Sequence, residues 1–274
     1  MARRRGGMMK LGFIGVGAIT EAVVTGLCEA GAPGLSILLS PRSRERSRAL
    51  AERHAIVEAA ASNQEVASRS ELVFLAVRPQ VAAEVLAALK FSQGQRVVSF
   101  IATLDSAEIA RRIRPAALVA RVAPVPPVAQ RKGPIAMCPP NEQLAELFGP
   151  ISTLIQVSDE AQLDAFFSVS AMMAPYFELL ESVSSWLRAQ GVEAAQADAY
   201  TGSLFSAIAV KSSQPAGEGF AELVAEHATR AGINEQMRRE LLAAGFYDRI
   251  KAGLDLIQAR MQGRATLNDT LETH

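Results

Sequence analysis

The chain of 274 residues has little of the side-chain chemistry that forms metal centres or disulfide frameworks. Its two cysteines, Cys28 and Cys138, are too few for a disulfide framework or a multi-cysteine metal cluster. Three histidines leave little for a histidine-based metal site. The chain also lacks the ~18 or more uninterrupted apolar residues of a membrane span. We therefore expect a protein without a bound metal and without membrane contact.

Positive and negative charges cancel over the whole chain but not within its halves. The 28 Lys and Arg side chains balance 28 Asp and Glu, yet residues 1–160 have an excess of five positive charges and residues 161–274 an excess of five negative ones. Part of the positive excess lies in the arginine-rich segment 42–53, and Arg3–Arg5 contribute three more charges. The acidic second half has no nucleic-acid signature, so we expect no nucleic-acid partner.

Both ends of the chain are expected to lie outside the folded domains. Arg3–Arg5 followed by the apolar run Leu11–Leu27 superficially resembles a twin-arginine signal peptide, but polar residues interrupt the run. We therefore expect residues 1–8 to be a disordered extension, residues 264–274 to be a flexible tail, and the protein to be cytoplasmic.

Up to about residue 155, short apolar runs alternate with amphipathic stretches. The runs are apolar on both faces, which is typical of parallel strands covered by helices. The pattern predicts a Rossmann-type doubly wound, mostly parallel sheet. The predicted strands are 11–15, 36–39, 71–77, 96–101, 117–122 and 134–137, and the predicted helices are 18–29, 43–53, one from Pro79, and 105–114.

Beyond residue 160 the apolar residues recur at helical spacing. We expect an all-α domain with helices over Leu163–Ala189, Ala194–Ser212, Gly217–Ala231 and Glu235–Met261. The predicted domains are thus a nucleotide-binding domain at 9–158 and a helical substrate and dimerisation domain at 159–263. These helices are apolar over wider arcs than one small bundle can bury, so we expect a homodimer through this domain.

The first chemical signal is the turn Gly15-Val16-Gly17-Ala18-Ile19-Thr20, which follows a predicted strand and opens a helix. In this context Gly15 permits a tight turn, and Gly17 lets the backbone approach a pyrophosphate at the helix N-terminus. The alternative is an ordinary glycine turn in an α/β protein. The third position of the motif is Thr20, so we expect slightly looser packing of helix against strand.

The second signal concerns which dinucleotide binds. An NAD site usually has an Asp or Glu about 20 residues after the glycines, where it holds the ribose 2′-hydroxyl. This chain has Ser40-Pro41-Arg42-Ser43 there and no carboxylate. Ser40, Arg42 and Ser43 can form hydrogen bonds to a 2′-phosphate, so the sequence favours NADP(H).

Five segments together resemble the pyrroline-5-carboxylate reductase family, in the family's order. The resemblance implies that the second to fourth segments border the cofactor, with Ala76, Val77, Arg78 and Pro79 in the third and Ala102 in the fourth, near the nicotinamide. It further implies NADPH-dependent hydride transfer to the C=N of a cyclic imine in proline biosynthesis, and a dimer formed by the helical domain. The segments are Met9–Gly17, Ser40–Arg42, Ala76–Gln80, Ser99–Ala102 and Arg121–Pro124.

The departures from the family fall where its substrate binds. Val125-Pro126-Pro127 replaces an Asn-Thr-Pro segment, and Met172-Met173 replaces two small residues. The family's carboxylate-binding loop corresponds to Ala228–Asn234, of which one glycine survives. In this loop we expect Asn234 to polarise the substrate and Arg230 to pair with a carboxylate. The three changes together favour a changed substrate, such as a related imine or keto acid, or a loss of activity.

Two other functions stay open at this point. One is a hydroxyacid-type NADP dehydrogenase on the same scaffold, for which Lys211 is the only helical candidate for a general base. The other is a catalytically inactive NADP-binding paralogue. His227 and Lys211 are more simply explained as structural or solvated side chains.

Overall fold

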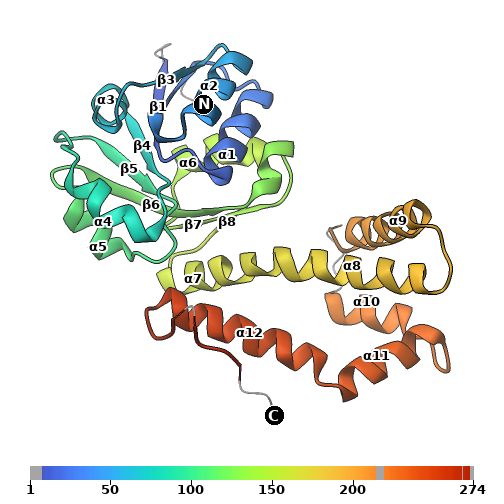
Figure 1. Cartoon of the computed structure of the whole chain (residues 1–274). Helices are drawn as coiled ribbons and strands as arrows, with labels where there is room; N and C mark the ends of the chain where they lie inside the picture. Colours follow the sequence, from blue (N-terminus) through green and yellow to red (C-terminus); the bar gives the residue numbers. More distant parts are fainter. Residues whose placement is uncertain (1–7, 214–218, 267, 272–274) are drawn as a thin grey trace. The chain divides into compact units, whose positions relative to one another are not determined.

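The computed structural model describes residues 8–213, 219–266 and 268–271. It divides the chain into two compact units, which we call the sheet unit and the helical unit (Figure 1). The sheet unit consists of Met1–Ser168 and Gln258–Thr266, and the helical unit of Val169–Ile257 and Leu267–His274.

An eight-stranded sheet forms the centre of the sheet unit, in the order β3-β2-β1-β4-β5-β6-β7-β8. All neighbouring strands are parallel except β6 and β7, which are antiparallel. This arrangement confirms the predicted Rossmann-type, doubly wound, mostly parallel sheet. The strands are β1 Met9–Ile14, β2 Leu35–Leu39, β3 Val57–Ala59, β4 Leu72–Leu75, β5 Arg96–Ser99, β6 Ala117–Pro124, β7 Pro134–Cys138 and β8 Thr153–Gln156.

Two hydrophobic cores lie on the two faces of this sheet, because side chains alternate along each strand. Phe13 and Phe74 point to one face, where their rings stack at a centroid distance of 4.5 Å. Ile14 and Leu75 point to the other. The first face is covered by α1 (Ala18–Glu29), α2 (Arg44–Arg53) and α6 (Glu142–Phe148), and the second by α3 (Asn63–Arg69), α4 (Pro79–Ala87) and α5 (Ser106–Arg112).

Four short elements of the sheet unit, namely β3, β8, α3 and α6, are absent from the sequence prediction. In β3 only Val57 is buried, and β8 has no fully buried residue. Neither strand therefore has the run of buried apolar side chains on which the strand prediction relies. Asp105 caps the N-terminus of α5, since its carboxylate accepts a hydrogen bond from the Glu108 amide at 2.7 Å. Tertiary contacts therefore form elements that local pattern alone does not indicate.

The helical region begins with α7 (Glu160–Val169), most of which belongs to the sheet unit. The predicted single helix 163–189 is wrong in one respect, because a 3-10 turn at Ser170–Met172 separates α7 from α8. The predicted helix 235–261 is likewise two helices, which part at Gly245, where φ is +69°. The remaining helices are α8 (Met173–Ala189), α9 (Ala194–Ser213), α10 (Phe220–His227), α11 (Ile233–Ala243) and α12 (Phe246–Met261).

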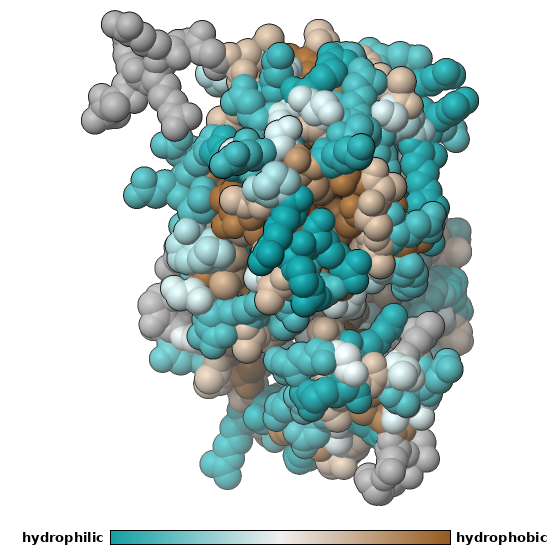
Figure 2. All heavy atoms as spheres, turned by 90° about the vertical axis from the view of Figure 1, so that its left-hand side faces the viewer, coloured by the Kyte–Doolittle hydropathy of each residue, from teal (hydrophilic) through white to brown (hydrophobic). Residues whose placement is uncertain are grey.

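Burial differs sharply between the two units. Among the described residues, Ala197 is the only fully buried apolar side chain of the helical unit. Apart from Met8, Ile56 and Phe166, all large apolar side chains that are well exposed belong to this unit. The face drawn in Figure 2 is mainly hydrophilic, with hydrophobic residues lying between the polar ones.

One stretch in the described part of the chain, Glu160–Ala189, is long and apolar enough to pass for a membrane helix by length and composition. The sequence pattern predicts none. A helix that covers a second protein chain has a similar composition, and the second half of this stretch carries Glu178, Glu181 and Arg188. The stretch is therefore weak evidence for a membrane span.

Candidate functional site

A groove with a volume of about 480 Å³ lies at the carboxyl ends of β1, β2 and β4. In an open α/β sheet this edge is where ligands bind. Eight of the residues predicted to bind the cofactor line this groove, together with Gln80 and Val81, which were not predicted to do so. The eight are Gly15, Val16, Gly17, Arg42, Ser43, Ala76, Val77 and Arg78.

The two glycines of the turn have different roles. Gly15 has φ +99°, and a Cβ there would lie 2.6 Å from the Ala76 carbonyl oxygen. Glycine is therefore required at this position by the fold itself. Gly17 has φ −93°, and a Cβ there would meet no atom within 4 Å, so the fold leaves open space beside it at the N-terminus of α1. That space is where an anion can approach the helix dipole and its free amides.

Two buried hydroxyl groups form hydrogen bonds to the backbone of Gly15 in the glycine turn. Ser40 is fully buried, and its Oγ accepts a hydrogen bond from the Gly15 amide at 2.9 Å. Its hydroxyl therefore supports the turn and does not face the groove, which corrects the prediction that Ser40 contacts a 2′-phosphate. Thr20 is also fully buried, and its Oγ1 donates to the Gly15 carbonyl at 2.7 Å. The expected looser packing at Thr20 is thus not seen.

Two exposed arginines line the groove on its two sides. Arg42 follows β2, and Arg78 precedes α4 as its N-cap residue. Within the described residues, neither side chain has an ion-pair partner, so both guanidinium groups are available to an anion. Arg46, in contrast, pairs with Glu21 at 3.2 Å, in agreement with a solvated helix face. An exposed guanidinium on a groove wall suits bidentate binding of a phosphate.

The other predicted cofactor residues do not line this groove. Ala18 and Ile19 open α1, and Pro79 is the first residue of α4. Ala102 lies in the loop between β5 and α5, and its carbonyl oxygen accepts a hydrogen bond from Arg121.

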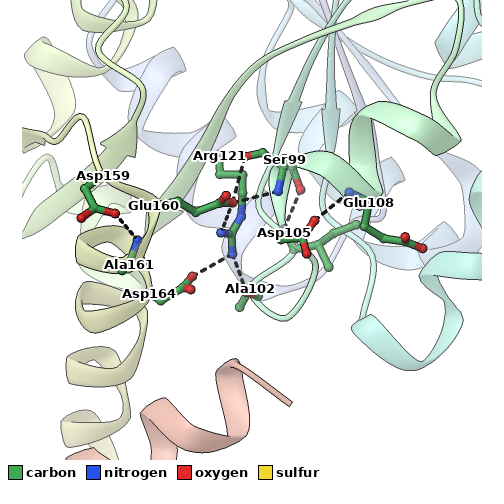
Figure 3. Close-up of polar contacts among 11 residues, drawn as sticks. Ser99, Ala102, Asp105, Glu108, Arg121, Asp159, Glu160, Ala161 and Asp164 are labelled. Carbon is green, nitrogen blue, oxygen red and sulfur yellow. Dashed lines mark hydrogen bonds and ion pairs between the residues drawn. The ribbon is translucent and has the colours of Figure 1, made fainter. Parts of the chain in front are cut away.

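The buried Arg121 on β6 is a polar residue whose position the sequence prediction missed (Figure 3). Only 1% of this residue is exposed, and its Nη1 and Nη2 lie 2.5 Å from Glu160 Oε1 and 3.1 Å from Asp164 Oδ1. Its Nη2 also donates to the Ala102 carbonyl at 2.6 Å. Burial raises the pKa of the Asp164 carboxyl above its ordinary value, although Arg121 acts in the opposite direction.

These contacts explain why α7 belongs to the sheet unit. Glu160 and Asp164 lie one turn apart on α7 and both pair with Arg121 of β6. The Arg121 guanidinium also lies 5.6 Å from the centre of the Phe167 ring. The signal in the sequence is a single arginine within an otherwise apolar strand, since a buried charge requires partners.

The predicted substrate residues lie in the helical unit. Arg230 belongs to the turn between α10 and α11, and Asn234 to the first turn of α11; both are exposed. Ala231 in the same turn has φ +63°, and a Cβ on Gly232 would lie 2.7 Å from Thr229 Oγ1. Ala231 thus adopts a left-handed backbone conformation, although this conformation favours glycine. The structure leaves the predicted roles of Arg230 and Asn234 as predictions.

Lys211 is engaged in an ion pair, since its Nζ lies 2.6 Å from Glu226 Oε1. This contact lowers the pKa of the Glu226 carboxyl. This ion pair occupies the Lys211 ammonium group, which speaks against Lys211 as a general base. His227 Nδ1 lies 2.8 Å from the Leu223 carbonyl oxygen, a contact within its own helix. Both residues are therefore accounted for by local structure.

Comparisons with known proteins agree with this geometry. A protein-family model described as coenzyme F420-dependent NADP oxidoreductase matches residues 10–103, which contain the glycine turn and the Arg78 segment. Pyrroline-5-carboxylate reductases of Haemophilus influenzae and Pseudomonas aeruginosa are 28% and 29% identical over 62% of this chain. The matched segments cover 65% and 66% of those two proteins, a little under two thirds of their length.

Solved structures extend the likeness in fold to nearly the whole chain. The 1-pyrroline-5-carboxylate reductase of Streptococcus pyogenes has a TM-score of 0.81 at 21% identity and covers 93% of this chain and 98% of its own. A Plasmodium falciparum pyrroline carboxylate reductase with NADP bound has a TM-score of 0.79 at 16% identity and covers 94% of this chain and 98% of its own. The fold and groove define a dinucleotide-fold protein with an added helical domain. Within that class, the chain is similar in sequence to pyrroline-5-carboxylate reductases.

Proposed function

We propose that this protein is an NADPH-dependent reductase that transfers hydride to the C=N of a cyclic imine, or to a related imine or keto acid. The observation that carries the proposal is the groove that joins the glycine turn to the two exposed arginines Arg42 and Arg78, with no carboxylate at the end of β2. The relatives named above are reductases of this kind by their names.

The residues of the groove fit NADP(H). Open space beside Gly17 admits a pyrophosphate at the N-terminus of α1, and Arg42 with Ser43 is placed to bind a 2′-phosphate after β2. Ala76, Val77 and Arg78 form the wall on the β4 side. When bound, the nicotinamide supplies the hydride, so the protein's part is to bind and orient the reactants.

The substrate is proposed to bind with residues of the helical unit. Asn234 would accept a hydrogen bond from the N–H of a protonated imine through its Oδ1, or donate one to a carbonyl oxygen, and Arg230 would pair with a carboxylate. A protonated cyclic imine is already electrophilic, which agrees with the structural roles of Lys211 and His227. The bulkier Met172 and Met173, and Val125–Pro127, support a substrate that differs from pyrroline-5-carboxylate, although that compound is the first to test.

We also propose a homodimer formed by the helical unit. Its large apolar side chains are exposed, and Trp186 and Tyr200 line an apolar cavity of about 530 Å³ beside α8 and α9. A second copy of the chain would cover these surfaces, as in obligate dimers, whose interfaces are as apolar as a divided core. A cytoplasmic location and a role in proline biosynthesis complete the proposal.

One experiment separates the functional hypotheses. Binding of NADPH and NADH is measured by fluorescence titration, and turnover is then followed with pyrroline-5-carboxylate, other cyclic imines and keto acids. We expect tighter binding of NADPH and turnover of at least one imine. Binding without turnover of any compound would identify an inactive paralogue, and oxidation of a hydroxyacid without imine reduction would identify the dehydrogenase.

A further inference from the structure

We propose that Arg121 is a positioning residue that fixes the loop Phe100–Asp105 so that it can bind the nicotinamide half of the dinucleotide. The inference rests on the proposed function, because it requires NADPH in the groove. It concerns a buried side chain that does not line the groove itself.

Strand order places this loop next to the second half of a bound dinucleotide. Arg42 marks the 2′-phosphate end after β2, the glycine turn follows β1, and Ala76–Arg78 follow β4. A dinucleotide that continues in the same direction across the edge of the sheet next meets the carboxyl end of β5. The loop Phe100–Asp105 begins there.

One ion pair holds both ends of this loop. Arg121 donates from Nη2 to the Ala102 carbonyl at 2.6 Å and from Nη1 to Glu160 Oε1 at 2.5 Å. The same Glu160 oxygen accepts hydrogen bonds from the Ser106 amide and hydroxyl, both at 2.8 Å. The loop is therefore tied near its start and just after its end to one ion pair, in which Arg121 is buried and Glu160 is partly exposed. Figure 3 shows Arg121 between Ala102 and Glu160.

Apolar contacts anchor the beginning of the loop as well. The Phe100 ring lies 5.4 Å from the Phe74 ring, centre to centre, and Ile101 is buried. The Ile101 amide also donates to Ser99 Oγ at 3.1 Å. The backbone from Ala102 to Asp105 has no such apolar anchor except the partly buried Leu104, so the Arg121 hydrogen bond sets the position of its first carbonyl.

The energetics favour a positioning role over a purely stabilising one. A buried ion pair is often no more stabilising than well-packed apolar residues of similar volume, because both charges lose their hydration. Among the described residues the Arg121 Nε finds no hydrogen-bond partner, so this arrangement leaves one donor of the guanidinium group unsatisfied there. What a guanidinium adds is directional geometry, since its planar fork orients a carbonyl and two carboxylates together.

The test compares two ligands that differ in the nicotinamide half. Dissociation constants for NADPH and for 2′,5′-ADP, which has the adenosine and 2′-phosphate but no nicotinamide, are measured by calorimetry on the full chain. Arg121→Lys keeps the charge but loses the fork, and Ser106→Ala removes a hydroxyl contact of Glu160. We expect both variants to weaken NADPH binding, Arg121→Lys by about tenfold, and to change 2′,5′-ADP binding by less than about twofold.

Arg96→Lys is the matched control, because Arg96 lies at the start of β5, away from the loop, and bonds to Gln143. We expect it to change neither affinity. If Arg121→Lys loses both ligands equally, or loses neither, the positioning role is wrong. If Arg121→Lys does not fold, as judged by its melting temperature, Ser106→Ala replaces it in the test. Equal loss of both ligands by Ser106→Ala, or loss of neither, would then show that the positioning role is wrong.

The wild-type chain separates this inference from the function on which it rests. Wild-type protein that binds 2′,5′-ADP but gains nothing from the nicotinamide half would overturn the positioning role and leave the cofactor site intact. Wild-type protein that binds neither ligand would overturn the proposed function, and the positioning role with it.

Discussion

The two units of this protein bury their apolar side chains in different ways. In the sheet unit, helices cover both faces of the sheet, and Phe13, Phe74 and their neighbours are fully buried within one chain. In the described part of the helical unit, by contrast, Phe177 and Trp186 are more than 60% exposed and only Ala197 is a buried apolar residue. We therefore expect the sheet unit to be stable by itself and the helical unit to be covered by another surface, as in the proposed dimer.

The largest expected effect comes from placing charge on the helical unit. Phe177→Glu and Trp186→Glu should convert the proposed dimer to monomer. In a symmetric dimer each change removes one apolar side chain from each copy and buries one carboxylate in each. With about 2 kcal/mol for each large side chain, the loss is about 4 kcal/mol, or roughly 1000-fold in the dissociation constant. Analytical ultracentrifugation measures the change in mass.

Ile56→Glu is the control for this comparison, because Ile56 is an exposed apolar residue of the sheet unit. It should leave the mass unchanged. A wild-type chain that sediments as a monomer would refute the proposed dimer. A wild-type chain that stays in solution only when detergent is present would refute it as well, and would assign the apolar face of Glu160–Ala189 to a membrane.

The next effect tests the sheet unit through its two glycines. Gly15→Ala should lower the free energy of unfolding by about 3 kcal/mol and abolish NADPH binding, because φ is positive and the new Cβ meets the Ala76 carbonyl. Gly17→Ala should leave the unfolding free energy within about 1 kcal/mol and weaken only NADPH binding, since no atom of the described residues lies within 4 Å of the added Cβ. Chemical denaturation and NADPH titration measure the two effects. Equal destabilisation by both changes would contradict the assigned roles.

A smaller effect concerns the choice of cofactor. Arg42→Ala should weaken NADPH binding by roughly 2 kcal/mol, or about 30-fold, because a charge-assisted contact to phosphate is lost. NADH, which has no 2′-phosphate, should bind as it does to wild type. Arg46→Ala is the control, since Arg46 pairs with Glu21 on the helix surface and should affect neither ligand. An equal loss for NADH would place Arg42 elsewhere than at the 2′-phosphate.

The sequence predicts the features that depend on neighbouring residues. The glycine turn and Arg42 each follow a strand within a few residues, so order along the chain is enough to place them on one edge of the sheet. The contacts of Arg121 and Glu160 join residues 19 to 54 positions apart, and only the folded chain brings them together. The prediction for Ser40 is wrong for the same reason, because its partner Gly15 lies in the turn that follows the adjacent strand.

The smallest effect compares the two left-handed residues that are not glycine, Arg131 in the sheet unit and Ala231 in the helical unit. Ala231→Gly should raise the free energy of unfolding by about 0.5–1 kcal/mol, because relief of the strained φ outweighs the greater entropy of glycine in the unfolded chain. Arg131→Gly should give a similar gain at φ 57°.

The two units are distinguished by measuring how the midpoint of each unfolding transition depends on protein concentration. If the helical unit folds only as part of a dimer, the gain from Ala231→Gly appears in a transition that shifts with protein concentration. The gain from Arg131→Gly should appear in the transition of the sheet unit, whose midpoint we expect not to shift. Both gains in a single transition would mean that the two units unfold together, and that the contrast in burial does not extend to stability.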